Sequence, residues 1–346
     1  MAGGGGRCGR HGAGAGATAG RAGPGGSPGC GRPGAGAGPL HPRPSSEGSD
    51  GVPGARRGGR GVMAAPRRLL LIRGLGHSGT TILDLALGAH PAITGLGEAV
   101  RLLETPAAGD AHRGPAQLRG PLRFERACTC GAVAAACPVW GPVLDWLPAN
   151  DHRPLLEKLH HLLDALAPAE DAWVVESYQD DRHLPLLSDP SLEIRVIHLT
   201  RDVRSWVHSR ARDGRRQGHW LPGLAPLLRW WRLSARHAAL FEECGKPVFR
   251  LGYEELALAP EASLRRLCRW LELDFDPAML QPVLHSGSHI LAGNRVRFDV
   301  EKGRAIHYDA DWMGMGAGVA QLALLWPPLA RLNRRLVYSG FTAGQR

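Results

Sequence analysis

A short apolar run followed by a glycine-rich turn constrains the fold of this chain more than any other stretch. Leu69–Ile72 are consecutive apolar residues that end before a glycine, a pattern typical of a buried parallel strand. Gly74, Gly76 and Gly79 follow, and residues 80–87 continue as a predicted helix. A strand, a glycine turn and a helix in this order form an anion site, because backbone N–H groups at the helix N-terminus converge on a phosphate.

The glycine turn differs at one position from G-x-x-x-x-G-K-[ST], the loop that binds nucleoside triphosphates. Gly74, Gly79 and Thr81 fit that pattern, but Thr80 stands where the lysine contacts the β- and γ-phosphates. This difference argues against a P-loop-type small-molecule kinase, which stays open as one alternative. A non-catalytic binder of nucleotides or nucleic acid is the other.

The sequence GHSGTT, the helix after it, and the His-Pro and Glu that follow resemble the 5′-phosphosulfate loop of the sulfotransferase family. That family uses 3′-phosphoadenosine 5′-phosphosulfate (PAPS) as co-substrate. The resemblance is to bacterial-type members, covers nearly all of residues 67–346, and implies an α/β fold with a P-loop-like central parallel sheet flanked by helices. It implies in-line transfer of a sulfuryl group to a hydroxyl or amine acceptor, with no metal. The implied contacts to the transferred end of PAPS are Gly76, Ser78, Gly79, Thr80 and Thr81.

A second stretch resembles the 3′-phosphate motif of the same family. Residues 195–200 read as a strand, and Arg201 follows at its carboxyl end, where open α/β sheets bind ligands. Asp202 fits the N-cap of the next helix, and Ser209 lies two turns into it. A guanidinium fork matches phosphate oxygens, and a hydroxyl donates one more hydrogen bond. Arg201 and Ser209 are therefore expected to bind the 3′-phosphate.

Two later stretches resemble the family as well. Residues 289–298 resemble a loop of bacterial members that could close over the nucleotide through Asn294, with Arg295 or Arg297 near the 3′-phosphate. Residues 248–256 resemble the strand and turn after the 3′-phosphate helix, and we assign them a structural role.

His77 and Glu98 are the predicted catalytic residues. The family usually has Lys or Arg immediately before Ser-Gly-Thr, to stabilise the leaving phosphate oxygen, and this chain has His77. The alternative is that His77 only shapes the loop and that Arg73 or Arg297 supplies the charge. Glu98 lies where the protein-tyrosine sulfotransferases have their general base. Glu98 could instead be a surface carboxylate or helix cap, and Glu176 is the reserve candidate for the base.

Three cysteines lie close together in the sequence. Cys128, Cys130 and Cys137 could bind zinc with a fourth ligand such as His112 or His152. The spacing C-x-C-x₆-C is not one of the usual zinc spacings, however, so the sequence favours a structural turn without a metal.

The first part of the chain has a different composition from the rest. Residues 1–62 contain 23 of the 47 Gly, and they contain eight Arg against only Glu47 and Asp50, so they carry six of the ten net positive charges. Such a segment buries too little apolar surface to offset its ordering entropy. We expect residues 1–66 to be disordered, with translation starting at Met63 as an open alternative.

We expect residues 67–346 to form a single domain of alternating strands and helices. No secretory signal or membrane span is visible, so the expected location is cytoplasmic. The expected partner is a small-molecule, glycan or tyrosine-type acceptor, without obligatory nucleic acid, and the oligomeric state is left open.

Residues Thr105–Asn150 are expected to be an irregular insertion. Beyond the first strand and helix, the predicted strands are 173–177, 195–200 and 248–251, and the predicted helices are 153–165, 203–212, 226–244, 261–272 and a kinked one over 319–335.

Overall fold

The computed structural model describes residues 66–105, 125–169, 171–179, 188–216, 222–293, 295–314 and 318–340. Residues 1–65 lie outside the described residues, so the expectation for the first segment stays a prediction. Within the described ranges, no helix combines the length and the apolar character that crossing a membrane requires.

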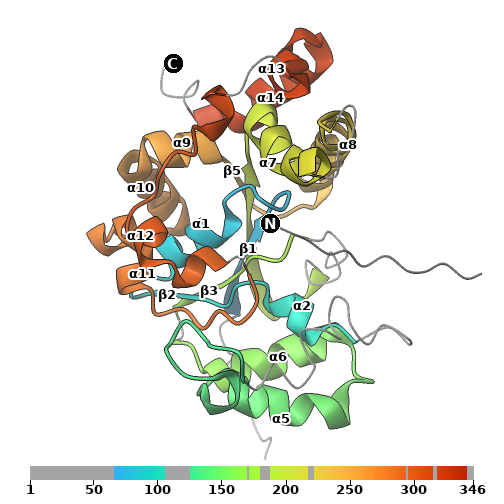
Figure 1. The fold of residues 1–346 in the computed structure, drawn as a ribbon. Helices are drawn as coiled ribbons and strands as arrows, with labels where there is room; N and C mark the ends of the chain where they lie inside the picture. Colours follow the sequence, from blue (N-terminus) through green and yellow to red (C-terminus); the bar gives the residue numbers. More distant parts are fainter. Residues whose placement is uncertain are drawn as a thin grey trace, which may run out of the picture. The chain divides into compact units, whose positions relative to one another are not determined.

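The centre of the fold is a five-stranded parallel sheet with the strand order β2-β3-β1-β4-β5 (Figure 1). The predicted α/β class is confirmed. Each predicted strand is present within a few residues of its expected ends, whereas β2 was not predicted, because three residues give too short a pattern. The strands are β1 (Arg67–Arg73), β2 (Ile93–Gly95), β3 (Trp173–Glu176), β4 (Leu192–Thr200) and β5 (Val248–Gly252).

Helices cover the sheet and extend beyond it. The expectation that residues 105–150 are irregular is wrong at its end, where α5 forms because Trp140, Val143, Leu144 and Leu147 are buried at helical spacing. The helices are α1 (Thr80–Leu87), α2 (Ala99–Leu103), α5 (Trp140–Asn150), α6 (Leu155–Leu166), α7 (Val203–Arg216), α8 (Leu224–Glu243), α9 (Tyr253–Leu258), α10 (Pro260–Leu271), α11 (Pro282–His285), α12 (Val300–Gly303), α13 (Val319–Leu322) and α14 (Pro327–Val337). Short 3₁₀ turns are η1 (Ala134–Ala136), η3 (Pro277–Leu280), η4 (Arg295–Phe298), η5 (Asp311–Gly314) and η6 (Ala323–Leu325). The single kinked helix predicted over 319–335 is thus divided into α13, η6 and α14.

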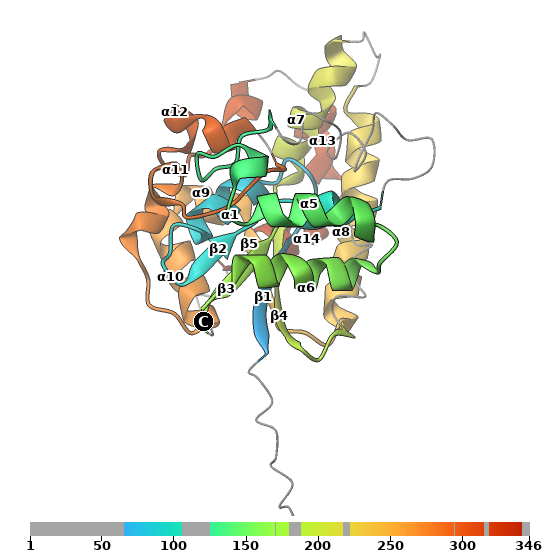
Figure 2. The same cartoon turned by 90° about the horizontal axis from the view of Figure 1, so that it is seen from below.

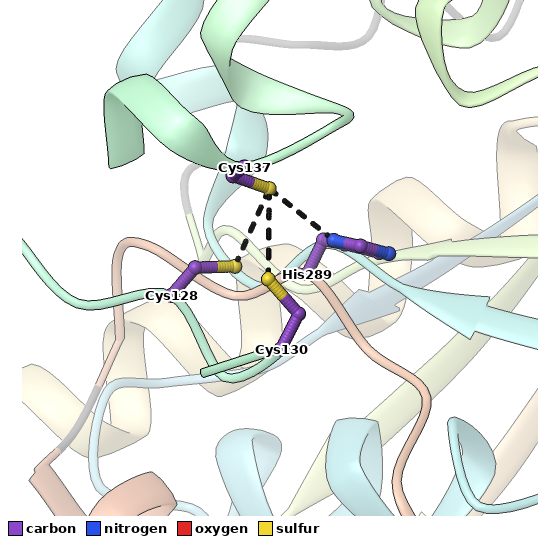
Figure 3. Close-up of side chains that lie close together, drawn as sticks. All are labelled: Cys128, Cys130, Cys137 and His289. Carbon is purple, nitrogen blue, oxygen red and sulfur yellow. Dashed lines mark hydrogen bonds between the residues drawn. The ribbon is translucent and has the colours of Figure 1, made fainter. Parts of the chain in front are cut away.

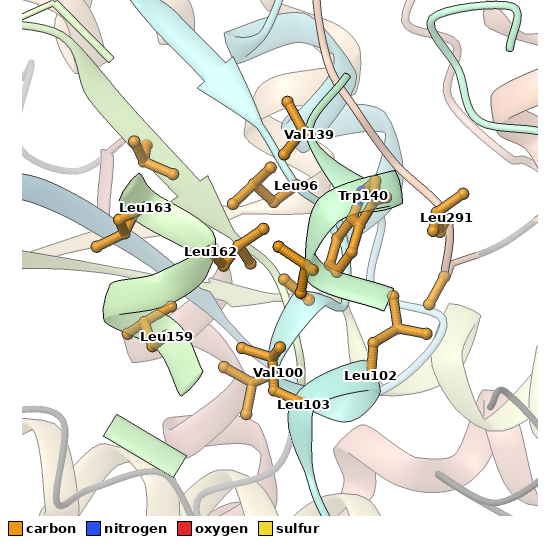
Figure 4. Packing of buried hydrophobic residues seen from close by; sticks show 14 of the residues in the cluster. Leu96, Val100, Leu102, Leu103, Val139, Trp140, Leu159, Leu162, Leu163 and Leu291 are labelled. Atoms are coloured by element: carbon orange, nitrogen blue, oxygen red, sulfur yellow. The ribbon is translucent and has the colours of Figure 1, made fainter. Parts of the chain in front are cut away.

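The two faces of the sheet bury alternate residues of the same strands. Leu69 and Leu71 of β1 face the cluster formed by α2, α5 and α6, which lie together in the lower part of Figure 1. Figure 2 shows α5 and α6 side by side in front of the strands. In that cluster the Trp140 ring packs among leucines, which include Leu291 of the stretch 289–298, called the late loop below (Figure 4). Leu70 and Ile72 face the opposite cluster, formed with α1, α9 and α10. Because both faces are covered, β1 is apolar throughout its middle.

The parallel pairing of β1 with β4 brings the turns after these two strands side by side. A Cβ on Gly74 would lie 2.1 Å from the carbonyl oxygen of Leu199, so only glycine allows this approach. Beyond it, Trp206 Nε1 donates to the Gly76 carbonyl (2.7 Å) and Arg201 Nη1 donates to the His77 carbonyl (3.1 Å). The glycine turn and the start of α7 are therefore fixed to each other.

Asp202 holds the start of α7 in place. Its carboxylate accepts from the backbone N–H of Arg204 (2.8 Å), the N-cap bond that the sequence predicts. The same carboxylate accepts from the Arg204 side chain (2.9 Å), from Asn333 Nδ2 (2.9 Å) and from the Tyr338 hydroxyl (2.8 Å). Burial opposes ionisation, but the hydrogen bonds from Arg204 and Asn333 hold the pKa of Asp202 below its ordinary value. The C-terminal helix thereby supports the position of Arg201.

Asp84 is a buried carboxyl group on α1. Its Oδ2 accepts from the backbone N–H of Gly97 (3.1 Å) and so fixes the turn that carries Glu98. Burial raises the pKa of Asp84 to about 7. A hydrogen bond from Ser177 acts in the opposite direction and lowers this pKa, whereas the nearby charge of Glu176 raises it further. Asp84 is therefore protonated in the folded protein over a range where an unfolded Asp is ionised.

This shift predicts a pH-dependent loss of stability that Asp84→Asn removes. Between pH ~4 and ~7 the unfolded chain ionises at this position and the folded chain does not, so the free energy of unfolding falls as pH rises. At 1.36 kcal/mol per pKa unit, the loss is on the order of 4 kcal/mol and stays constant above pH ~7. Chemical denaturation between pH 5 and pH 8 should show Asp84→Asn gaining stability relative to the wild type as pH increases.

The exposed Asp145 of α5 provides a matched control. Asp145→Asn makes the same chemical change on the exposed side of α5, and its pH profile is compared with that of Asp84→Asn. Parallel pH profiles for the wild type and Asp84→Asn would contradict the assignment of a raised pKa to Asp84.

Candidate active site

A cavity of about 740 Å³ lies at the carboxyl ends of β1 and β4. Both predicted phosphate motifs border it, because the parallel pairing of β1 with β4 places the turns after these strands at the same edge of the sheet. Ser78 is buried beneath the turn and does not line the cavity. The predicted residues in the lining are Gly76, His77, Gly79, Thr80, Thr81, Glu98, Arg201 and Ser209.

The N-terminus of α1 points its first turn at the cavity. Gly79 precedes the helix with φ +92°, and a Cβ there would lie 2.7 Å from the Tyr253 ring. Among the described residues, no side chain caps this helix, and the positive end of its dipole faces the cavity at Thr80 and Thr81. This end of the cavity can bind a phosphate or sulfate group.

His77 has an unusual backbone and a cationic neighbour. Its φ is +71°, in the left-handed region that non-glycine residues rarely adopt. Arg210 Nη1 of α7 donates to His77 Nε2 (3.0 Å). Because a guanidinium has no acceptor, this nitrogen of His77 carries no proton. A neutral imidazole and an arginine therefore stand together beside the glycine turn, and the sequence reasoning missed Arg210 although it directly follows Ser209.

Arg201 has polar contacts throughout its guanidinium group. Nε donates to Ser205 Oγ (2.7 Å), and Nη2 forms an ion pair with Asp309 Oδ2 (2.7 Å). The Tyr253 ring lies under the guanidinium, 4.7 Å from its carbon to the ring centroid. Ser209 lines the same cavity from the next turns of α7. The Asp309 carboxylate thus occupies one edge of the Arg201 guanidinium, the group that was predicted to bind a phosphate.

Glu98 lies at the start of α2 and lines the cavity. Its carboxylate accepts from Arg101 Nη1 (2.9 Å), and the backbone N–H of Glu98 donates to the Ala292 carbonyl (3.1 Å). The carboxylate does not cap the helix. It is therefore oriented by a side chain one turn away and supported by the late loop.

Arg73 and Glu176 form a buried pair away from the cavity. Arg73 Nη2 lies 2.7 Å from Glu176 Oε2, close but not aligned as a hydrogen bond, and Glu176 accepts from the backbone N–H of Tyr178 (3.0 Å). Neither lines the cavity. Glu176, the reserve candidate for the base, and Arg73, the alternative source of charge, therefore lie behind the residues that line the cavity.

The late loop contributes its backbone rather than Arg297. Arg297 Nη1 donates to the Gly293 carbonyl (2.5 Å), so this guanidinium braces its own loop and does not line the cavity. Gly293 and Val296 do line it. Asn294 and the side chain of Arg295 lie outside the described residues, and their nucleotide contacts stay predictions.

Tyr253 and Asp309 are further cavity residues that the sequence reasoning missed. The Tyr253 hydroxyl donates to the His307 carbonyl (2.9 Å) and accepts from the backbone N–H of Asp309 (3.1 Å). Tyr253 directly follows β5, at the same sheet edge as Arg201, and this position was the available signal. The segment around Asp309 has no sequence pattern that would have identified it.

Comparison with known proteins identifies the chain's family. The family model described as "Sulfotransferase family" matches residues 70–277, which is more than half of the chain. Human carbohydrate sulfotransferase 6 is 32% identical over 124 residues, which span 30% of this chain and 31% of that protein. The sulfotransferase domain of the Synechococcus PCC 7002 olefin synthase has a similar fold, with a TM-score of 0.51, 20% identity, and coverage of 79% of this chain and 96% of that one. The chain belongs to the sulfotransferase family.

Proposed function

We propose that this protein transfers the sulfuryl group of PAPS to an acceptor hydroxyl or amine. The observation that carries the proposal is that one cavity is bordered by two separate anion-binding features. The glycine turn before α1 offers backbone N–H groups, and Arg201 with Ser209 offers a guanidinium and a hydroxyl. A nucleotide with phosphate groups at both its 5′ and 3′ positions uses both features, whereas AMP uses only one.

In the proposed reaction the acceptor oxygen attacks the sulfur of PAPS in line with the leaving phosphate oxygen. The new O–S bond forms as the bond between sulfur and the 5′-phosphate breaks, which releases 3′,5′-adenosine bisphosphate. The acceptor proton passes to the Glu98 carboxylate, which Arg101 orients. By analogy with phosphoryl transfer, the remaining contribution is positioning and neutralisation of charge.

Arg210 is the proposed source of positive charge near the leaving oxygen: it is not itself among the residues that line the cavity, but it contacts His77, which does. The sequence reasoning assigned this role to His77, but its Nε2 accepts a hydrogen bond from Arg210. In this proposal His77 positions the Arg210 guanidinium, and Arg210 supplies the charge that the Lys or Arg before Ser-Gly-Thr usually supplies in the family.

Asp309 is proposed to compete with the 3′-phosphate. Its carboxylate pairs with Arg201 at 2.7 Å, so a bound phosphate has to displace it or repel it. Nucleotide binding therefore breaks one ion pair to form another of the same kind.

The acceptor class is proposed from the similarity to one curated relative. Similarity to carbohydrate sulfotransferase 6 favours a sugar hydroxyl over a tyrosine or another small molecule. The aligned segment covers about a third of that relative, so the acceptor is part of the proposal. Cytoplasmic location likewise stays a prediction.

Calorimetry with 3′,5′-adenosine bisphosphate and AMP tests the nucleotide assignment. The bisphosphate should bind more tightly, and Arg201→Ala should weaken it by about 10- to 100-fold, since a charge-assisted hydrogen bond contributes ~1.5–3 kcal/mol. Asp309→Asn should strengthen it. Arg265→Ala, at an exposed side chain of α10, should leave binding unchanged. Equal affinity for AMP and the bisphosphate would count against the proposal, and tight binding of ATP with Mg²⁺ would favour the kinase.

Glu98→Gln tests the base. This variant keeps the shape and the hydrogen-bonding oxygen but cannot take a proton, so turnover of PAPS with a carbohydrate acceptor should fall about 10²–10⁴-fold. The affinity for 3′,5′-adenosine bisphosphate should stay as in the wild type. Wild-type turnover in Glu98→Gln would eliminate Glu98 as the base and leave the nucleotide assignment standing.

A further inference from the structure

Four potential metal ligands converge outside the cavity. The sulfur atoms of Cys128, Cys130 and Cys137 and a ring nitrogen of His289 all lie within 4.8 Å of one another (Figure 3). Cys137 Sγ lies 3.7 Å from Cys128 Sγ, 3.8 Å from Cys130 Sγ and 3.3 Å from His289 Nδ1. Cys128 and Cys137 are buried, and Cys130 reaches solvent.

These separations match a tetrahedral zinc site. With Zn–S at about 2.3 Å and Zn–N at about 2.0–2.1 Å, tetrahedral angles put two sulfurs about 3.8 Å apart and a sulfur and a nitrogen about 3.6 Å apart. A disulfide needs two sulfurs at about 2.05 Å and would leave the third cysteine and His289 without a role. The four groups thus have the number, type and spacing of zinc ligands.

A tight turn brings the first two cysteines together. Ala127 pairs with Val133 across the turn, and Cys128 N donates to the Ala132 carbonyl (2.8 Å). Gly131 has φ +90°, which favours glycine, and its N–H donates to the Cys128 carbonyl (3.0 Å). Cys128 and Cys130 therefore both face the segment that carries Cys137, directly after η1.

Protein contacts hold the histidine segment beside this turn. Thr129 Oγ1 donates to the Ser288 carbonyl (2.5 Å) and accepts from the backbone N–H of Ile290 (2.9 Å). Trp140 Nε1 donates to the carbonyl of His289 itself (2.6 Å). The backbone on both sides of His289 is thus positioned by groups that are not ligands, as outer contacts commonly do in metal sites.

We propose that Cys128, Cys130, Cys137 and His289 bind one Zn²⁺ as a Cys₃His structural site. Four protein ligands complete the tetrahedron, so no position is open for a substrate. This replaces the sequence-based expectation of a turn without a metal. His112 lies outside the described residues, His152 is not in the cluster, and His289 was missed because it lies far along the chain.

The site ties the late loop to the insertion before α5. From His289 the loop continues to Ala292, whose carbonyl accepts from Glu98 N (3.1 Å), and to Gly293, which lines the cavity. The zinc would therefore stabilise the backbone that supports Glu98. Its effect on turnover would be indirect, through the position of this loop.

Metal analysis of the full chain, purified with reductant and without chelator, tests the proposal without reference to sulfuryl transfer. We expect one zinc per chain by mass spectrometry of the metal. After zinc removal, added Co²⁺ should give the visible absorption of tetrahedral thiolate coordination. Cys130→Ser and His289→Gln should each lower zinc affinity by at least about tenfold, and Cys244→Ser, outside the cluster, should not.

Cys130 is exposed, so its variant tests the site even if replacing a buried cysteine prevents folding. Removing zinc from the wild type should also lower Tm by several degrees, and the Cys130→Ser protein should show a smaller response to chelator. Reduced wild-type protein that neither contains zinc nor binds Co²⁺ would overturn the proposal. So would a Cys130→Ser or His289→Gln variant with wild-type metal affinity.

Discussion

The close approach of the turns after β1 and β4 is the constraint on which the site depends. Gly74 lies against the Leu199 carbonyl with no room for a side chain, and hydrogen bonds from Trp206 and Arg201 then fix the glycine turn to the start of α7. The two proposed anion sites, one made of backbone groups and one made of a guanidinium, thereby share a cavity. Neither turn alone would select a nucleotide that carries two phosphate groups.

Buried polar groups around this contact hold the loops that carry the proposed active-site residues. Asp202 is saturated by donors from its own helix and from the C-terminal helix, and it supports Arg201. Asp84 holds the turn before Glu98, and its raised pKa reflects burial together with the nearby charge of Glu176. The proposed zinc site supports the same turn from the other side, through the Ala292 carbonyl. The turn that carries Glu98 is thus held by two other segments, α1 and the loop that contains Ala292.

Much of the fold could be predicted because its signals are local. The apolar runs at Leu69–Ile72 and Val196–Leu199 specify strands. The glycines that follow the first run, Gly74, Gly76 and Gly79, specify a turn. The residues that were missed depend on contacts between distant segments. Arg210 meets His77 only after β1 and β4 pair, and His289 meets the cysteines only once the late loop packs on Trp140. Asp309 comes from a segment with no periodic pattern, and nothing local indicates that it faces Arg201.

The central claim is that one cavity binds both ends of a nucleotide phosphorylated at the 3′ and 5′ positions. A crystal structure with 3′,5′-adenosine bisphosphate tests this most directly. We expect the 5′-phosphate at the backbone N–H groups of Gly79–Thr81, and the 3′-phosphate within hydrogen-bond distance of Arg201 and Ser209 with Asp309 displaced. A nucleotide bound with its 3′-phosphate away from Arg201, and with the Arg201–Asp309 pair intact, would contradict it.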